Sequence, residues 1–188
     1  MRKLKLQVQM TVDGFVCGPN GELDWAMMQW TDDVKKYVTE LTDSCDTILL
    51  GHNMTDGFVK HWEAALEKPE SEEYAFAKKM VDYPKIVFSR TLTESNWNNT
   101  TLQNSIDIIN ELKNMDGKDI IVYGGATFVS SLIEANLIDE YYLVINPAAI
   151  GNGRRIFGDN YHIFNLTLLE SRTFDSGKVL NKYKPKDK

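Results

Sequence analysis

The chain has 188 residues, of which 43% are hydrophobic and 26% are charged, and its formal net charge is -6. This size and composition suit one compact globular domain and leave too little chain for a second full domain. No long block of basic residues is present, which excludes the electrostatic footprint of a nucleic-acid-binding protein. We therefore expect one domain over residues 1–184 and a polar tail over 185–188.

The N-terminal residues and the two cysteines indicate where in the cell the protein is located. Residues 1–5 lead directly into an alternating strand instead of a continuous apolar stretch, so the sequence predicts neither a signal peptide nor a membrane span. Cys17 and Cys45 lie far apart and have no zinc-binding spacing, so we expect two reduced thiols and no metal site. Together these features predict a cytoplasmic protein with no membrane partner.

The first half of the chain is typical of α/β folds. Apolar and polar residues alternate over 4–11, which predicts a strand with one buried face. A turn-rich loop over 18–25 and a helix over 31–42 follow. The apolar run 46–50 is stopped by Gly51, a pattern typical of a buried parallel strand that leads into a helix.

Further helix and strand units follow. A helix over 71–81 leads to a strand over 85–88. Ser105 is the expected N-cap of the next helix and Gly117 its residue C′, and a strand over 120–123 comes after it.

The C-terminal part begins with two glycines and an amphipathic helix that contains Phe128 and Ile133. A strand over 141–145 comes next, and strands over 165–173 and 178–183 form an expected hairpin. Alternating βα units followed by a hairpin predict a three-layer α/β/α sandwich. Its central sheet would be mixed but mostly parallel, with a C-terminal antiparallel hairpin.

The glycines after the predicted strand over 120–123 are the most informative candidate site. Ligands bind beyond the carboxyl ends of strands in an open parallel sheet. Gly124 and Gly125 would let a phosphate approach backbone N–H groups at the positive end of the following helix, and Thr127 could add a hydroxyl. The same glycines also suit a tight turn with close strand–helix packing, and the sequence leaves both interpretations open.

Two other strand ends offer similar chemistry. Gly51 would begin a second helix N-terminus, and Ser89 with Arg90 would provide a hydroxyl and a cation. Three such places at one sheet edge could hold a pyrophosphate and a ribose phosphate. Each also has a simpler interpretation, as a turn glycine or a solvated surface arginine.

Six short motifs extend this pattern through nearly the whole chain. They are Thr11-x-Asp13-Gly14, Gly21-x-x-Asp24-Trp25, Leu50-Gly51-x-x-Met54, Phe88-Ser89-Arg90, Tyr123-Gly124-Gly125 and Pro147-x-x-x-Gly151-x-Gly153-x-x-x-Phe157. In this order they resemble the dihydrofolate reductase superfamily, specifically its branch of riboflavin-biosynthesis reductases, the RibD C-terminal-domain proteins. The resemblance implies NADPH binding, reduction of pterin-like or pyrimidine substrates, and a homodimer.

The resemblance also assigns residues. The adenosine-phosphate side of the cofactor would be bound by Gly51, His52, Asn53, Met54, Ser89 and Arg90, and the pyrophosphate by Gly124, Gly125, Ala126, Thr127 and Phe128. Asp13 and Trp25 would border the nicotinamide and the substrate, which makes them the candidate catalytic residues.

Two positions depart from the family pattern. His52 stands where family members commonly carry an arginine that binds the 2′-phosphate of NADPH; losing that contact weakens affinity by about 1.5–3 kcal/mol. NADH therefore stays open as a cofactor unless Arg90 compensates. Trp30 stands where dihydrofolate reductases place a carboxylate proton donor, and the nearby Asp32 and Asp33 are favoured as dipole-stabilising surface residues.

The sequence thus predicts an NADPH-dependent reductase that transfers a hydride to a small pterin- or aminopyrimidine-like substrate. A non-catalytic dinucleotide-binding or ligand-sensing homodimer is the alternative, and it explains the two departures better. In a third interpretation the paired glycines serve packing alone and no nucleotide binds.

Overall fold

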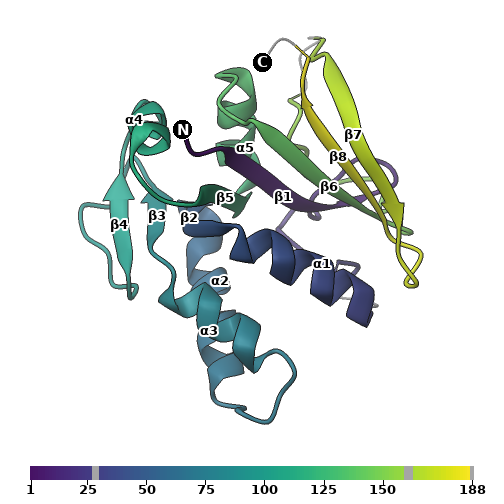
Figure 1. Ribbon diagram of the computed structural model, residues 1–188, viewed down its shortest axis with the longest axis horizontal. Helices are drawn as coiled ribbons and strands as arrows, with labels where there is room; N and C mark the ends of the chain where they lie inside the picture. The colour runs from purple at the N-terminus through teal and green to yellow at the C-terminus, as the bar shows by residue number, and fades with distance from the viewer. Residues whose placement is uncertain (27–29, 159–162, 187–188) are drawn as a thin grey trace.

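The computed structural model describes residues 1–26, 30–158 and 163–186. The strands are Leu4–Thr11 (β1), Cys45–Gly51 (β2), Lys85–Phe88 (β3), Thr100–Gln103 (β4), Asp119–Gly124 (β5), Glu140–Asn146 (β6), Leu166–Thr173 (β7) and Val179–Pro185 (β8). The helices are Asp32–Asp43 (α1), His52–Leu66 (α2), Tyr74–Asp82 (α3), Ile108–Asn114 (α4) and Ala126–Glu134 (α5). The strands form an 8-stranded sheet in the order β4-β3-β2-β5-β1-β6-β8-β7 (Figure 1).

The sheet is parallel from β4 to β6 and turns antiparallel at the C-terminal hairpin. Strand β1 lies in the middle, where Leu6 pairs with Val122 on β5 and with Tyr141 on β6. Strand β8 runs antiparallel to both β6 and β7. The predicted mixed, mostly parallel sheet with a C-terminal hairpin is therefore confirmed.

Helices cover both faces of the sheet, as Figure 1 shows. One core cluster joins α5 and α4 to the face that carries Leu6 and Val8 of β1. The other joins α1, α2 and α3 to the opposite face, where Ile48 and Val144 lie. Central strands such as β5 are buried on both faces, which is why their sequences read as continuous apolar runs.

Three local predictions need correction or extension. Strand β4 was not predicted, because Thr100–Gln103 is short and polar and becomes a strand only by pairing with β3. The N-cap of α4 is Asp107, whereas Ser105 accepts the Asp107 N–H in the preceding turn. Strand β8 runs through Pro185, and its ladder thus extends into the segment expected as a tail.

Other findings concern the cysteines and helices. Cys17 and Cys45 are both free thiols, as predicted. Within the described ranges no helix has the length and hydrophobicity needed to cross a bilayer, and no group of acidic, histidine and cysteine side chains there could hold a metal ion.

Candidate functional site

Two helix N-termini meet at the carboxyl edge of the sheet. A Cβ added to Gly125 would lie 3.0 Å from the Cα of Gly51, and Gly125 has a φ of +92°, which L side chains rarely adopt. Neither α2 nor α5 has a side-chain cap. The N-termini of the two helices therefore lie beside each other, an arrangement that favours an anion. The close packing that the sequence left open is present, and it is what brings the two N-termini together.

A cavity of about 560 Å³ lies beside the N-terminus of α5. The helix lines it with Ala126, Thr127 and Ser130, and the segment after β6 lines it with Arg154 and Arg155. This volume is within the range of small-molecule sites. Two guanidinium groups beside a positive helix end make the cavity suitable for phosphate groups.

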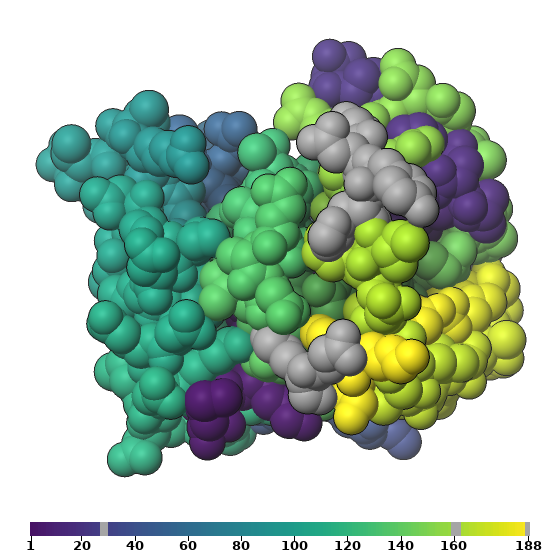
Figure 2. All heavy atoms as spheres, turned by 90° about the horizontal axis from the view of Figure 1, so that it is seen from above, coloured from purple at the N-terminus to yellow at the C-terminus, as the bar shows by residue number. Residues whose placement is uncertain are grey.

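The two arginines are held by contacts between the loops after β1 and β6. Arg154 donates its backbone N–H to the Cys17 carbonyl at 2.9 Å, and its carbonyl accepts the Val16 N–H at 2.9 Å. The guanidinium of Arg155 lies 4.5 Å from the centroid of the Phe15 ring. Figure 2 shows the segment after β1, in purple, beside the segment after β6, in light green. The loop contacts thus fix where the positive charge lies.

Asp13, a predicted catalytic residue, belongs to this loop junction. Its Oδ2 accepts the backbone N–H groups of Ile150 at 3.1 Å and Gly151 at 2.7 Å. Hydrogen bonds from the Thr11 side chain and the Gly151 backbone lower the pKa of Asp13. Asp13 is therefore ionised at neutral pH and positions the loop, and it is a poor proton donor.

Trp25, the other predicted catalytic residue, is half-buried in the segment between β1 and α1. Its indole N–H is buried and has no hydrogen-bond partner among the described residues. Trp30 also lies there and donates its indole N–H to the Ala26 carbonyl at 3.1 Å. Lys178 donates to the same carbonyl at 3.2 Å, and its Nζ lies 5.0 Å from the Trp30 ring centroid.

The residues assigned to the adenosine side lie along neighbouring strand ends. His52 and Met54 are half-buried and Asn53 is exposed in the first turn of α2. Ser89 is buried, and its hydroxyl accepts the backbone N–H groups of two residues in the turn after β3. Arg90 is exposed. The serine therefore shapes a turn, whereas the arginine is accessible to a ligand.

Phe128 and the acidic start of α1 complete the predicted set. Phe128 stacks on Phe88 with ring centroids 4.6 Å apart. Asp33 accepts the Val34 N–H at 2.8 Å and the Asp175 N–H at 2.9 Å, and hydrogen bonds, the largest from Thr31, lower its pKa. Asp33 thus links the helix start to the C-terminal hairpin and supplies no proton.

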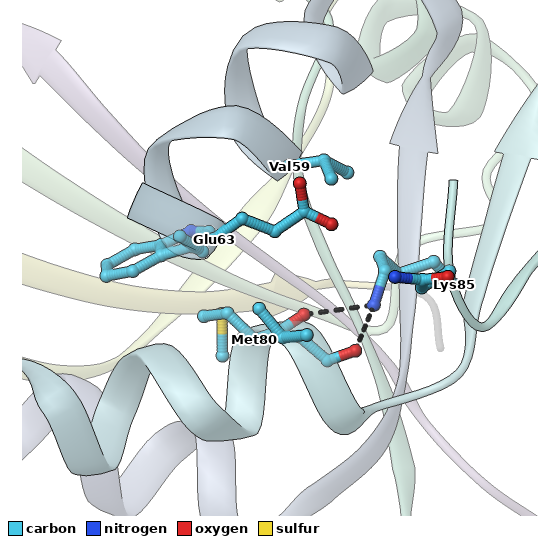
Figure 3. Close-up of a pocket in the computed structure, with 7 residues that line it drawn as sticks. Val59, Glu63, Met80 and Lys85 are labelled. Atoms are coloured by element: carbon cyan, nitrogen blue, oxygen red, sulfur yellow. Dashed lines mark hydrogen bonds between the residues drawn. The ribbon is translucent and has the colours of Figure 1, made fainter. Parts of the chain in front are cut away.

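A second concave place, between α2 and α3, is filled by protein. Lys85 donates its ammonium to the carbonyls of Met80 at 3.1 Å and Val81 at 2.7 Å, as Figure 3 shows. The space leaves no room for a water-sized ligand. Trp62 lines it from within α2. This place stabilises the end of α3 and is no candidate site.

A family model for the RibD C-terminal domain matches residues 2–180. The chain belongs to the RibD C-terminal domain family. The uncharacterized Bacillus subtilis protein YyaP is 36% identical over 179 residues, which cover 95% of this chain and 92% of YyaP. The uncharacterized protein YwjB of the same organism is 22% identical over 188 residues, which cover 96% of this chain and 97% of YwjB. The family resemblance predicted from the six motifs is confirmed.

Solved structures of RibD-related proteins share the fold. A putative riboflavin biosynthesis protein from Shewanella sp. PV-4 superposes with a TM-score of 0.75 at 20% identity, covering 99% of both chains. A diaminohydroxyphosphoribosylaminopyrimidine deaminase/5-amino-6-(5-phosphoribosylamino)uracil reductase from Thermotoga maritima gives 0.67 at 16% identity, covering 98% of this chain and 56% of that one. A pyrimidine reductase-like protein from Corynebacterium diphtheriae superposes with a TM-score of 0.65 at 14% identity, covering 98% of this chain and 92% of that one. The fold is dihydrofolate-reductase-like.

This RibD C-terminal domain brings together most of the residues assigned from its sequence. The ends of β3, β2, β5 and β1 are consecutive in the sheet, so the assigned segments share one edge. Sequence reasoning missed Arg154 and Arg155. Their one signal was the neighbouring Gly151-x-Gly153 motif, whose second glycine is required because a Cβ there would lie 2.2 Å from the Cys17 carbonyl oxygen.

Proposed function

We propose that the chain is an NADPH-dependent reductase that transfers a hydride to a small planar heterocycle of the pterin or aminopyrimidine type. One observation carries the proposal: two uncapped helix N-termini lie side by side next to a cavity lined by two arginines. A dinucleotide is an anion that needs such N–H donors and cations along one sheet edge. The family and the reductase names of its structural neighbours agree with this chemistry.

The chain's own residues would bind and orient both reactants. N–H groups at the starts of α2 and α5 would hold the pyrophosphate, with Thr127 and the two cavity arginines as additional donors. NADPH, when bound, supplies the hydride. Trp25 and Trp30 offer ring surfaces against which a flat substrate could stack, so that the protein contributes orientation.

We propose NADPH as the preferred cofactor and NADH as the weaker one. His52 occupies the first position of α2, and its imidazole lacks the two-pronged N–H geometry with which a guanidinium binds a phosphate. Arg90, exposed at the end of the neighbouring strand β3, would serve the 2′-phosphate instead.

A cytoplasmic homodimer is the proposed form of the protein. The outer strand β7 exposes Leu168 by 53% and Leu169 by 45%, and an edge strand with exposed leucines can pair with a second copy. Sedimentation should therefore give twice the chain mass of 21.5 kDa. A monomer at micromolar concentration contradicts this part of the proposal.

A non-catalytic dinucleotide sensor is the second candidate, and one observation favours it. Asp13, after β1, and Asp33, at the start of α1, both accept backbone N–H groups and have lowered pKa values. Neither is therefore suited to donate the proton that reduction of an imine requires.

A titration separates the two candidates. NADPH and NADH binding is measured by calorimetry, and the absorbance of the bound cofactor is then followed with pterin and aminopyrimidine substrates. The proposal expects micromolar NADPH binding and cofactor oxidation with at least one substrate class. Tight binding with no oxidation supports the sensor, and no binding at millimolar cofactor contradicts both.

A further inference from the structure

Buried polar atoms without a hydrogen-bond partner gather at one edge of the molecule. Within the described residues these side-chain atoms are Nε2 of Gln9, Oδ1 of Asp13, Nε1 of Trp25 and Oδ1 of Asn146. All belong to the carboxyl halves of β1 and β6 or to the segment after β1. Each such group costs about 1–3 kcal/mol of stability, so their concentration at one edge indicates a role in binding.

Gln9 and Asn146 form a pair with a defined orientation. Asn146 is 1% exposed, and its Nδ2 donates to Oε1 of Gln9 at 2.9 Å and to the carbonyls of Met10 and Val144 at 3.2 Å each. The two backbone carbonyls can only accept, so the end of the Asn146 amide that faces them is its NH2 group. The group of Gln9 that this NH2 contacts must then be its oxygen, which fixes the orientation of the Gln9 amide. One acceptor, Oδ1 of Asn146, and one donor, Nε2 of Gln9, are left over.

Lys178 adds positive charge on the same face. The β6–β8 register pairs Ile145 with Val179, which places Lys178 opposite Asn146 at the next step of the ladder. Strand alternation turns Lys178 to the face of Leu180, which packs in the α1-side core. Lys178 is 1% exposed and forms no ion pair with a described residue, so its remaining N–H groups are available to an acceptor.

We propose that Gln9 and Asn146 bind the amide edge of a ligand, with its carbonyl oxygen accepting from Gln9 and its N–H donating to Asn146. A carboxylate would leave Asn146 without a donor, and an ammonium group would leave Gln9 without an acceptor. Adjacent C=O and N–H groups on a rigid ligand satisfy both, and the Lys178 ammonium favours the carbonyl oxygen. The inference rests on the proposed function only in placing the reactants at this edge.

Two reactants could carry this amide, a lactam ring of the substrate or the carboxamide of the nicotinamide. The first arm therefore compares isocarbostyril, a flat bicyclic lactam, with N-methylisocarbostyril, which lacks the N–H. The second compares NADP+ with its acetylpyridine analogue, in which a methyl ketone replaces the carboxamide. Affinities are measured by calorimetry on the wild-type protein. We expect the amide-bearing member of one pair to bind about tenfold more tightly than its partner.

Variants assign that preference to the two residues. Gln9→Met and Asn146→Ala should each reduce the preference to below about twofold. Gln7→Met is the matched control, because Gln7 is a buried glutamine two residues earlier on the same face of β1 and away from the edge. It should leave the preference unchanged. Asn146→Ala removes three internal hydrogen bonds, so its thermal unfolding is measured as well. If Asn146→Ala is unfolded, the result for Gln9→Met alone tests the proposal.

The outcomes separate this inference from the proposed function. Equal binding within both pairs, absence of binding by all four probes at millimolar concentration, or a preference that survives in Gln9→Met overturns the inference. Cofactor oxidation together with equal binding leaves the reductase standing and removes the amide site. A lactam preference in a protein that binds no dinucleotide supports the amide site and contradicts the reductase.

Discussion

The two ends of the parallel strands use charged residues in opposite ways. At the amino edge, Arg2 pairs with Asp46 at the start of β2, and Lys5 lies 2.7 Å from Asp119 at the start of β5. At the carboxyl edge, Arg90, Arg154, Arg155 and Lys178 form no ion pair with any described residue. The same residue types stabilise one edge and are left without an internal counter-charge at the other.

The orientation of the helices explains the difference. In a parallel α/β sheet the helix N-termini, which are positive, lie at the carboxyl edge of the strands. Arginines placed there are stable only in water or beside an anion. At the amino edge the carbonyl ends of the helices accept cations: Lys118 donates its ammonium to the Asp43 carbonyl at the end of α1 at 2.9 Å. Lys79, in the last turn of α3, pairs with the Asp43 carboxylate. We infer that the amino edge holds the fold together and the carboxyl edge binds the ligand.

Gly125→Val should have the largest effect on stability, because the carboxyl edge depends on close backbone contact. The valine would adopt a φ of +92° and place its Cβ 3.0 Å from the Gly51 Cα. We expect a loss of about 4 kcal/mol or more in the free energy of unfolding, measured by urea denaturation. Gly57→Ala in α2 is the control, since no atom lies within 4 Å of the new Cβ, and it should stabilise by about 0.5–1 kcal/mol.

Glu140→Gln tests the amino edge. Burial acts to raise the pKa of Glu140, but hydrogen bonds led by that from Lys3 lower it to about 2. A folded pKa below the unfolded value stabilises the protein above the unfolded pKa, and this stability is lost as the pH falls from about 5 to about 2. We expect Glu140→Gln to lose about 3 kcal/mol at pH 7 and to flatten the acid limb of the stability curve. Exposed Glu94→Gln should keep the wild-type curve.

Lys178→Met should raise the free energy of unfolding, whereas Glu140→Gln lowers it, because the carboxyl edge buries the Lys178 charge without a counter-charge. Burial lowers the pKa of Lys178 from 10.5 to about 8. The unfolded chain then binds more protons between these values, so wild-type stability rises as the pH rises from about 8 to about 10.5. We expect Lys178→Met to be about 2 kcal/mol more stable at pH 7, with the gain vanishing by about pH 10.5. A variant that is less stable than wild type at pH 7 contradicts the contrast between the edges.

Replacing both cavity arginines should change stability least. The Arg154→Ala, Arg155→Ala double variant should shift the free energy of unfolding by less than about 1 kcal/mol, because both side chains are exposed. Its affinity for NADPH, measured by calorimetry, should fall about 10- to 100-fold. Arg172→Ala is the control, since Arg172 is an exposed arginine on β7 outside the cavity. Unchanged NADPH affinity in the double variant would remove the cavity from the cofactor site.

Local sequence patterns determined the order of most elements, the mixed α/β sheet with its C-terminal hairpin and the glycine-rich strand ends, and the six motifs together carried the family resemblance. They could do so because burial on one or both faces of a strand imposes a period that is visible in the sequence. Strand β4 could not be predicted in this way, because Thr100–Gln103 is polar and becomes extended only by pairing with β3.

Only the tertiary structure decided which distant side chains meet. Gln9 and Asn146 are far apart in the chain, and the β1–β6 register brings their amides to 2.9 Å. Arg154 reaches the α5 N-terminus through its ladder with Cys17. Such contacts depend on strand order, register and loop geometry, which a residue's own neighbours in sequence do not encode. The amino acids thus determined where the candidate ligand-binding edge lies, and the fold decided which groups face it.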